Sequence, residues 1–126
     1  MVVDDSATIR DLISMNLELE GYDVVTAEHA QACLDHLAQV AEGKQPPPRL
    51  MLLDVVMPGL DGVELTARLK ATPATADIPI LIVSASAQRR DFELARGAGA
   101  DGYLTKPFAP DELLREVARL ILPEEA

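Results

Sequence analysis

Two hydrophobic patterns alternate along the chain. Short apolar or β-branched runs occur at residues 2–3, 22–27, 50–53, 78–84 and 102–105. After each run, apolar residues recur at roughly helical spacing, in residues 7–20, 28–41, 63–70, 88–96 and 110–122. The first pattern is typical of strands and the second of helices. The sequence therefore predicts strand and helix in alternation, five times over.

Residues that begin and end helices support these boundaries. Asp5 or Ser6 can cap the first helix, and Gly21 can end it. Three successive prolines at residues 46–48 predict an extended loop before the third strand, and the sequence assigns no function to that loop. Residues 123–126 are expected to form a frayed tail.

The run at residues 50–53 ends on the carboxylate of Asp54, and a turn rich in proline and glycine follows it. An uninterrupted apolar run of this kind indicates a strand buried on both faces, as in a parallel sheet covered by helices. The alternation predicts an α/β fold with a single doubly wound five-stranded parallel sheet and right-handed crossovers. In such sheets, ligands bind outside the carboxyl ends of the strands, where Asp54 is expected.

Composition narrows the class of protein. At 126 residues the chain can form one domain, and 48% hydrophobic with only 3% aromatic residues predicts an aliphatic core. A formal net charge of −10 disfavours direct binding of nucleic acid. Cys33 is the only cysteine, so no internal disulfide is expected. No membrane span and no leader are recognised, so we expect a soluble, cytoplasmic protein.

Polar side chains lie at the end of four of the five predicted strands or just after it. They are Asp4 and Asp5, Asp54, Ser84 and Lys106. Carboxylates gathered at one sheet edge repel one another unless a hard cation such as Mg²⁺ neutralises them, and a lysine and a serine can bind phosphoryl oxygens. Neither His29 nor His36 lies at a strand end, so no nucleophile and base pair is recognised. What remains is an aspartate that itself accepts a phosphoryl group.

Four short motifs lie at these strand ends. They are Asp-Asp-Ser at 4–6, Asp-Val-Val-Met-Pro-Gly-Leu-Asp-Gly at 54–62, Ser-Ala at 84–85 and Gly-Tyr-Leu-Thr-Lys-Pro-Phe at 102–108. Each motif is weak alone, but together they resemble the receiver domain of two-component response regulators, of the chemotaxis-regulator-like kind. The resemblance covers essentially the whole chain. It implies a flavodoxin-like (βα)5 fold with strand order 2-1-3-4-5.

The resemblance also implies a role for each polar residue. Asp54 would be the phosphoacceptor, and the ligands of Mg²⁺ would be Asp4, Asp5, Asp54 and the backbone carbonyl of Val56. Lys106 would pair with the phosphoryl group, and its peptide bond to Pro107 would be cis. Such a domain is not an enzyme beyond catalysing its own phosphorylation and dephosphorylation.

The expected signal passes from the phosphoryl group to a surface. Ser84 would hydrogen-bond a phosphoryl oxygen and draw Tyr103 inward, which would alter the surface of the fourth helix, fifth strand and fifth helix. The phosphoryl donor would be a histidine kinase or a histidine phosphotransfer protein. The output would reach a downstream protein target or effector domain, from a monomer or a phosphorylation-dependent dimer.

The chain departs from the family pattern in two places. The first apolar run is shorter than receivers usually have, which is compatible with a clipped start. We expect residues 1–126 to be one receiver domain with no effector domain, either free-standing or cut from a larger protein. Val56 stands where many receivers carry a polar side chain that helps to orient the hydrolytic water, which predicts slow self-dephosphorylation.

Two other functions compete with a signalling switch. An Mg²⁺-dependent phosphohydrolase that forms an aspartyl-phosphate would need a second acid at the position of Val56. A flavodoxin-like binding module would need a first loop rich in glycine or hydroxyl groups, which the sequence does not have. Taken singly, the polar residues at the strand ends have ordinary structural roles as caps, turn formers and surface charges. Their joint occurrence favours the switch.

Overall fold

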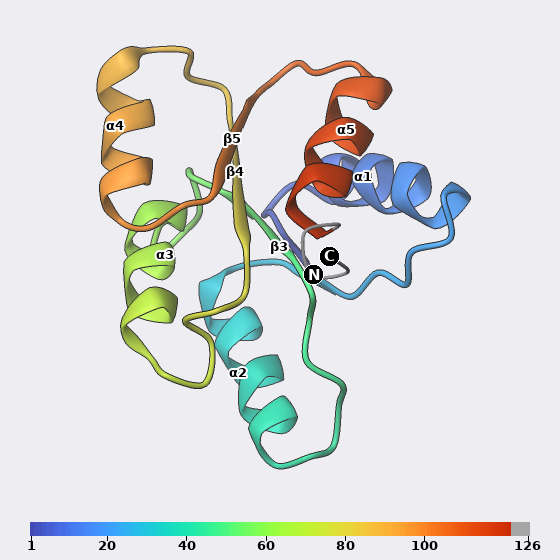
Figure 1. Cartoon of the computed structure of the whole chain (residues 1–126), viewed down its shortest axis with the longest axis vertical. Helices are drawn as coiled ribbons and strands as arrows, with labels where there is room; N and C mark the ends of the chain where they lie inside the picture. Colours follow the sequence, from blue (N-terminus) through green and yellow to red (C-terminus); the bar gives the residue numbers. More distant parts are fainter. Residues whose placement is uncertain (122–126) are drawn as a thin grey trace.

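A single parallel sheet of five strands forms the centre of the computed structural model, which describes residues 1–121 (Figure 1). The elements are β1 (Val2–Val3), α1 (Ala7–Leu19), β2 (Thr26–Ala27), α2 (Ala30–Ala41), β3 (Met51–Asp54), α3 (Gly62–Ala71), β4 (Ile80–Ser84), α4 (Arg89–Gly97), β5 (Gly102–Thr105) and α5 (Pro110–Ile121). The strand order is β2-β1-β3-β4-β5, which confirms the predicted α/β fold. Leu122 and the predicted tail lie outside the described residues.

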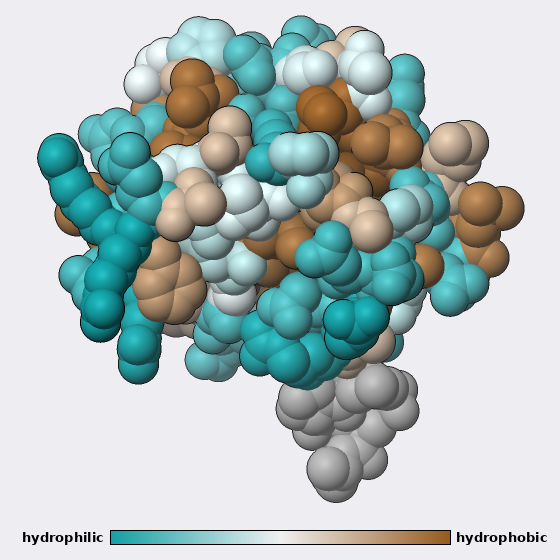
Figure 2. All heavy atoms as spheres, turned by 90° about the horizontal axis from the view of Figure 1, so that it is seen from above, coloured by the Kyte–Doolittle hydropathy of each residue, from teal (hydrophilic) through white to brown (hydrophobic). Residues whose placement is uncertain are grey.

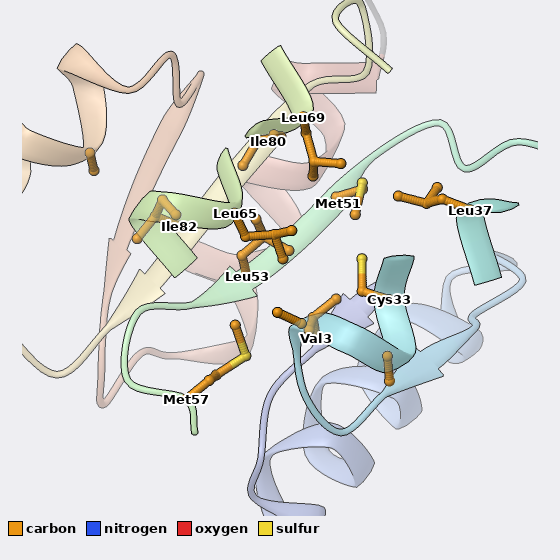
Figure 3. Close-up of a cluster of buried hydrophobic side chains, with 13 residues drawn as sticks. Val3, Cys33, Leu37, Met51, Leu53, Met57, Leu65, Leu69, Ile80 and Ile82 are labelled. Atoms are coloured by element: carbon orange, nitrogen blue, oxygen red, sulfur yellow. The ribbon is translucent and has the colours of Figure 1, made fainter. Parts of the chain in front are cut away.

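Helices cover both faces of the sheet, with α1 and α5 on one face and α2, α3 and α4 on the other (Figure 1). Successive side chains of a strand point to opposite faces, so Met51 and Leu53 join the cluster under α2 and α3, whereas Leu52 joins the cluster under α1 and α5. The first cluster is seen in Figure 3, where Leu65 of α3 packs beside Leu53. Burial on both faces explains why the strand at 50–53 has no polar interruption.

The second strand is much shorter than predicted. Residues 22–27 were expected to be β-structure, but β2 contains only Thr26 and Ala27. Its only neighbour in the sheet, β1, pairs with it through two residues, Val2 opposite Thr26 and Val3 opposite Ala27. Before these pairs, the carbonyl of Val25 still accepts the backbone N–H of Val2 at 2.8 Å, so the pairing with β1 reaches back to Val25, and residues 22–24 of the expected run are not paired as strand. All other described boundaries lie within two residues of the prediction.

Capping residues set the starts of the helices near the sheet edge. Ser6, one of the two predicted caps, accepts a hydrogen bond from the backbone N–H of Ile9 at 3.3 Å. His29 caps α2 by accepting from the N–H of Ala32 at 3.1 Å, which gives this histidine a structural role. Each cap fixes where the chain turns from strand into helix.

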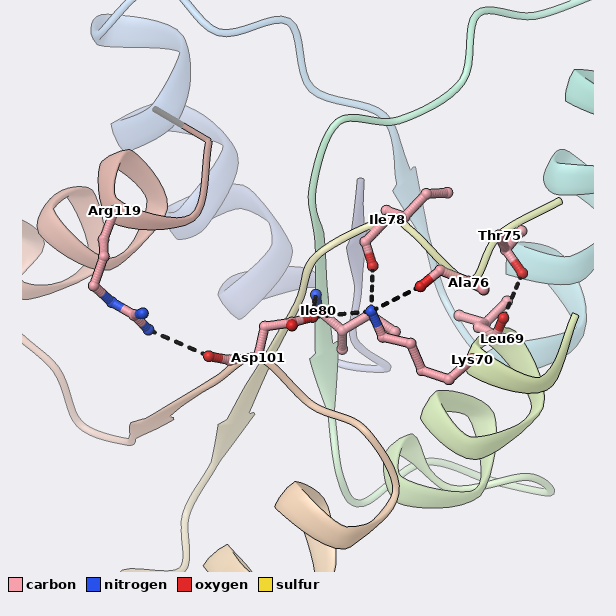
Figure 4. A network of polar contacts seen from close by, with 8 residues as sticks. All are labelled: Leu69, Lys70, Thr75, Ala76, Ile78, Ile80, Asp101 and Arg119. Atoms are coloured by element: carbon pink, nitrogen blue, oxygen red, sulfur yellow. Dashed lines mark hydrogen bonds and ion pairs between the residues drawn. The ribbon is translucent and has the colours of Figure 1, made fainter. Parts of the chain in front are cut away.

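Lys70 ties together the elements at the end of the sheet where β4 begins. Its Nζ donates to the carbonyls of Ala76 and Ile78, and it lies 3.0 Å from Oδ2 of Asp101 (Figure 4). The same carboxylate oxygen accepts the backbone N–H of Ile80 at 2.9 Å. This network lies at the opposite end of the strands from Asp54, which makes Lys70 a useful control below.

Candidate functional site

Three carboxylates meet at the carboxyl ends of β1 and β3. Asp54 is the last residue of β3, and Asp4 and Asp5 follow β1, its hydrogen-bonded neighbour. One oxygen from each carboxylate lies within 4.8 Å of those of the other two. Asp4 and Asp54 are buried, whereas Asp5 is exposed. Carboxylate oxygens at this spacing are a donor set that fits a hard divalent cation such as Mg²⁺.

Lys106 supplies positive charge to this cluster. Its Nζ lies 3.0 Å from Oδ2 of Asp4 and 3.3 Å from Oδ1 of Asp54. Lys106 follows directly after β5, and its backbone N–H donates to the carbonyl of Ser84 at 2.7 Å. The peptide bond from Lys106 to Pro107 is cis, as the family resemblance implies.

Burial raises the pKa of the Asp54 carboxyl, and the neighbouring charge of Asp4 raises it further. The ion pair and hydrogen bond with Lys106 act in the opposite direction, as does a hydrogen bond from the backbone of Val56. The net shift of the Asp54 pKa is upward, so the ionised carboxylate is less favourable in the folded protein than in water. A bound cation would reduce this unfavourable contribution.

The position of Asp4 is fixed from both sides. Its Oδ1 accepts the backbone N–H of Ser6 at 2.9 Å while its Oδ2 faces Lys106, and its carbonyl accepts a hydrogen bond from Arg10 at 2.7 Å. Both carboxylate oxygens of Asp4 are therefore engaged within the protein. Asp5 is the member of the cluster whose carboxylate is exposed to solvent.

Gly62, the first residue of α3 after the loop from β3, lies very close to the backbone of Asp54. A Cβ atom placed on Gly62 would lie 2.2 Å from the backbone oxygen of Asp54, which is closer than atoms can approach. The N–H of Gly62 donates to the carbonyl of Val55 at 3.0 Å and closes the loop. Sequence reasoning treated Gly62 as part of a turn and did not recognise this close approach. Val56 is 75% exposed. The slow self-dephosphorylation expected from an apolar residue at this position stays a prediction.

Replacing Gly62 by alanine is expected to lower the free energy of unfolding by about 2 to 3 kcal/mol, because the backbone must move to relieve the overlap. Gly97 is the matched control, since nothing lies within 4 Å of a Cβ at that helical position. Gly97→Ala should be neutral or stabilising by roughly 0.5 to 1 kcal/mol. Urea denaturation of both variants measures the difference, and an equal effect of the two changes would contradict the close approach.

Ser84 and Tyr103 lie on the neighbouring strands. Ser84 ends β4, one residue beyond Val83, the register partner of Asp54, and its side chain is buried. Its Oγ accepts the backbone N–H of Ser86 at 3.1 Å. The hydroxyl of Tyr103, on β5, donates to the carbonyl of Ser86 at 2.8 Å. The residues expected at the switch are thus connected through Ser86, whose part the sequence did not reveal.

The Tyr103 ring also contacts α4. The ring of Phe92 meets it edge to face, with 5.6 Å between the ring centroids, and Phe92 is partly exposed. Figure 2 looks onto the molecule from above the view of Figure 1, and polar side chains are interspersed with apolar ones over that face. A change at Tyr103 would therefore reach side chains on the surface.

A separate cavity of about 380 Å³ lies at the amino ends of the first three strands. The three prolines of residues 46–48 line it, together with Tyr22 and His36. The cavity is therefore at the far end of the sheet from Asp54. Among residues 1–121, no helix is both long enough and apolar enough to cross a membrane.

Comparison with known proteins gives the family to which this fold and its acidic cluster belong. The profile of the response regulator receiver domain matches residues 1–118. The chain belongs to this family. Receiver domains are signalling domains of two-component systems rather than enzymes, they bind Mg²⁺ in their acidic pocket, and they interact with histidine kinases and effector domains.

Three relatives illustrate the similarity. The chain is 42% identical over 120 residues to the phosphate regulon transcriptional regulatory protein PhoB of Pseudomonas aeruginosa, covering 95% of this chain and 48% of that protein. It is 40% identical over 121 residues to the DNA-binding dual master transcriptional regulator RpaA of Synechocystis, covering 96% and 48%. The chemotaxis protein CheY4 of Vibrio cholerae superposes with a TM-score of 0.82 at 29% identity, covering 94% of each chain. The chain thus spans about half the length of the curated relatives it matches.

Proposed function

We propose that this receiver domain accepts a phosphoryl group on Asp54 from a phosphohistidine of a histidine kinase or a histidine phosphotransfer protein. The observation that carries the proposal is the meeting of three carboxylates within 4.8 Å, with Lys106 in contact with two of them. Asp54 is the acceptor because it is the acid at the end of the central strand β3, between neighbours β1 and β4.

Transfer requires positioning and charge neutralisation more than covalent help from the protein. A carboxylate oxygen of Asp54 forms the new bond to phosphorus while the phosphorus–nitrogen bond to the donor imidazole breaks, and the imidazole leaves with that electron pair. The residues that would hold Mg²⁺ are Asp4, Asp5, Asp54 and, through its backbone carbonyl, Val56. When bound, Mg²⁺ would supply positive charge to the phosphoryl oxygens, and Lys106, which contacts Asp4 and Asp54, supplies a second positive charge.

The output is a change at the surface formed by α4, β5 and α5. Phosphorylation adds charge and acceptor oxygens, so the Ser84 hydroxyl gains a partner that only the phosphorylated state offers. A shift of Ser84 is transmitted through the loop after β4 to Tyr103 and, through the contact with Phe92, to α4. The domain responds as a monomer or by phosphorylation-dependent dimerisation.

The partners belong to the same proposal. A cytoplasmic domain at residues 1–126 passes its state to a downstream protein target or effector domain. Two relatives are named as transcriptional regulators, yet the formal net charge of −10 disfavours direct contact between this domain and nucleic acid. Any contact with DNA would therefore be made by an effector.

The decisive experiment supplies acetyl phosphate and Mg²⁺ and measures intact mass. The wild-type protein should gain one phosphoryl group, and Asp54→Asn should gain none, because the amide cannot act as the acceptor. Asp23→Asn is the matched control, since Asp23 is exposed and lies before β2, far from the acidic cluster. Absence of a mass gain in the wild type, or an equal gain in Asp54→Asn, would refute the assignment of Asp54.

A further inference from the structure

The loop between β4 and α4 is held by one residue, Ser86. Its N–H donates to Oγ of Ser84 at 3.1 Å, and its carbonyl accepts the hydroxyl of Tyr103 at 2.8 Å. Its hydroxyl donates to the carboxylate of Asp91 and accepts the backbone N–H of Gln88 at 3.2 Å. A single residue thus connects the end of β4, the first turn of α4 and the side chain of Tyr103.

The bond to Ser84 decides how that hydroxyl is presented. A serine hydroxyl has one hydrogen to donate and two lone pairs that accept. Because the Ser86 N–H occupies a lone pair, the hydrogen of the Ser84 hydroxyl is left to donate to another acceptor. A phosphoryl oxygen on Asp54, beside the end of β4, is such an acceptor.

The bond to Asp91 decides where the loop itself lies. Ala85, Ala87 and Gln88 are all exposed, so packing restrains this loop little. The N-cap of α4, Gln88, makes no side-chain cap hydrogen bond, and the Ser86 hydroxyl accepts its N–H instead. The contact between the Ser86 hydroxyl and the Asp91 carboxylate is therefore the main polar link between loop and helix among the described residues.

We propose that Ser86 is a positioning residue of the switch: its hydroxyl, held by Asp91, places the loop so that the Ser84 hydroxyl can donate to the phosphoryl group and Tyr103 can bind the Ser86 carbonyl. This inference rests on the proposed function, because it concerns how Asp54 phosphorylation is read. It assigns a role to two residues outside the motifs recognised in the sequence.

The test uses beryllofluoride, a stable mimic of the phosphoryl group, together with Mg²⁺ in an NMR titration. Asp91→Ala should weaken beryllofluoride binding by about fivefold, as expected for the loss of one hydrogen bond. Ser86→Ala also removes the acceptor of the Gln88 N–H and should weaken binding at least as much. The double variant should bind no more weakly than Ser86→Ala, because Ser86→Ala already removes the contact with Asp91. Ser86→Thr keeps the hydroxyl and should restore binding close to the wild-type affinity.

The control is Glu93→Ala, which removes an exposed acid of the same helix whose partner is Arg89 rather than the loop. Its affinity should equal that of the wild type. A second readout follows the NMR signals of the Tyr103 ring. The chain has only two tyrosines, so the tyrosine signals that remain in Tyr22→Phe belong to Tyr103. Ser86→Ala and Asp91→Ala should move the Tyr103 signals in the same direction, and Glu93→Ala should leave them in place.

The outcomes separate two kinds of failure. If beryllofluoride does not bind the wild type, or binds Asp54→Asn equally well, the proposed function is wrong. If it binds the wild type and Ser86→Ala with equal affinity, or if the losses in Ser86→Ala and Asp91→Ala add, the role of Ser86 is wrong while the function of Asp54 stands. Asp91→Ala gives the same test from the helix side if Ser86→Ala does not fold.

Discussion

Lys106→Met is expected to slow phosphorylation of Asp54 by acetyl phosphate on the order of a hundredfold, the usual effect of removing one donor from developing charge in a buried site. The ammonium group lies 3.0 Å from Asp4 and 3.3 Å from Asp54, so it is the protein cation placed to meet the phosphoryl oxygens. Methionine keeps most of the apolar stem and removes the charge. Phosphorylation rates come from the increase in intact mass with time at saturating Mg²⁺.

Lys70→Met is the matched control for this prediction. The side chains of Lys70 and Lys106 are both 20% exposed, and each forms an ion pair with an aspartate. Lys70, however, lies at the other end of the strands, with Asp101 and the carbonyls before β4. Lys70→Met should lower stability without changing the phosphorylation rate of the folded protein. A wild-type rate in Lys106→Met, or equal slowing in both variants, would contradict the proposed role.

The elements that could be predicted from the sequence are those whose signal is local. The apolar run at residues 50–53 and the β-forming run before Ser84 identify their own strands, because burial on both faces excludes polar residues. The length of β2 is not determined by its own residues alone. It depends on the pairing with β1, which joins Val2 to Thr26 and Val3 to Ala27 across a separation of more than twenty residues.

The acidic cluster could be predicted for a geometric reason. Parallel strands place their carboxyl ends at one edge, so residues more than a hundred positions apart, such as Asp4 and Lys106, come into contact. The same reasoning does not reach the loops. The overlap that excludes a Cβ at Gly62 and the four hydrogen bonds of Ser86 depend on loop conformation, for which the sequence carries no periodic signal.

A second large effect is expected in the absence of metal, where Asp54→Asn should be more stable than the wild type at neutral pH. Burial and the charge of Asp4 raise the pKa of Asp54 in the folded protein. Between the unfolded and folded pKa values, the folded state binds more protons than the unfolded state, so the contribution of Asp54 to stability increases as the pH falls. The advantage of Asn at neutral pH is about 1.4 kcal/mol for each unit of upward shift.

This advantage should disappear under two conditions. As the pH falls through the folded pKa of Asp54 toward its ordinary value of 3.8, the wild-type carboxyl becomes neutral and the two proteins converge. Saturating Mg²⁺ should reverse the order, because a cation that binds only the folded state stabilises it by about 2.7 kcal/mol at a hundred times its dissociation constant. Since Asp54→Asn removes one of the carboxylates within 4.8 Å, it should gain much less.

Urea denaturation at several pH values, with and without Mg²⁺, measures these differences for the wild type, Asp54→Asn and the exposed-site control Asp23→Asn. The control is needed because the chain carries 21 acidic residues, and their titration also changes the free energy of unfolding with pH. This contribution is common to the three proteins and cancels when they are compared with one another. Asp23→Asn should follow the wild type and respond fully to Mg²⁺. Two results would contradict this prediction: Asp54→Asn is the less stable protein without metal, or Mg²⁺ stabilises all three proteins equally. In either case, a cation at this site does not offset the burial of ionised Asp54 beside Asp4.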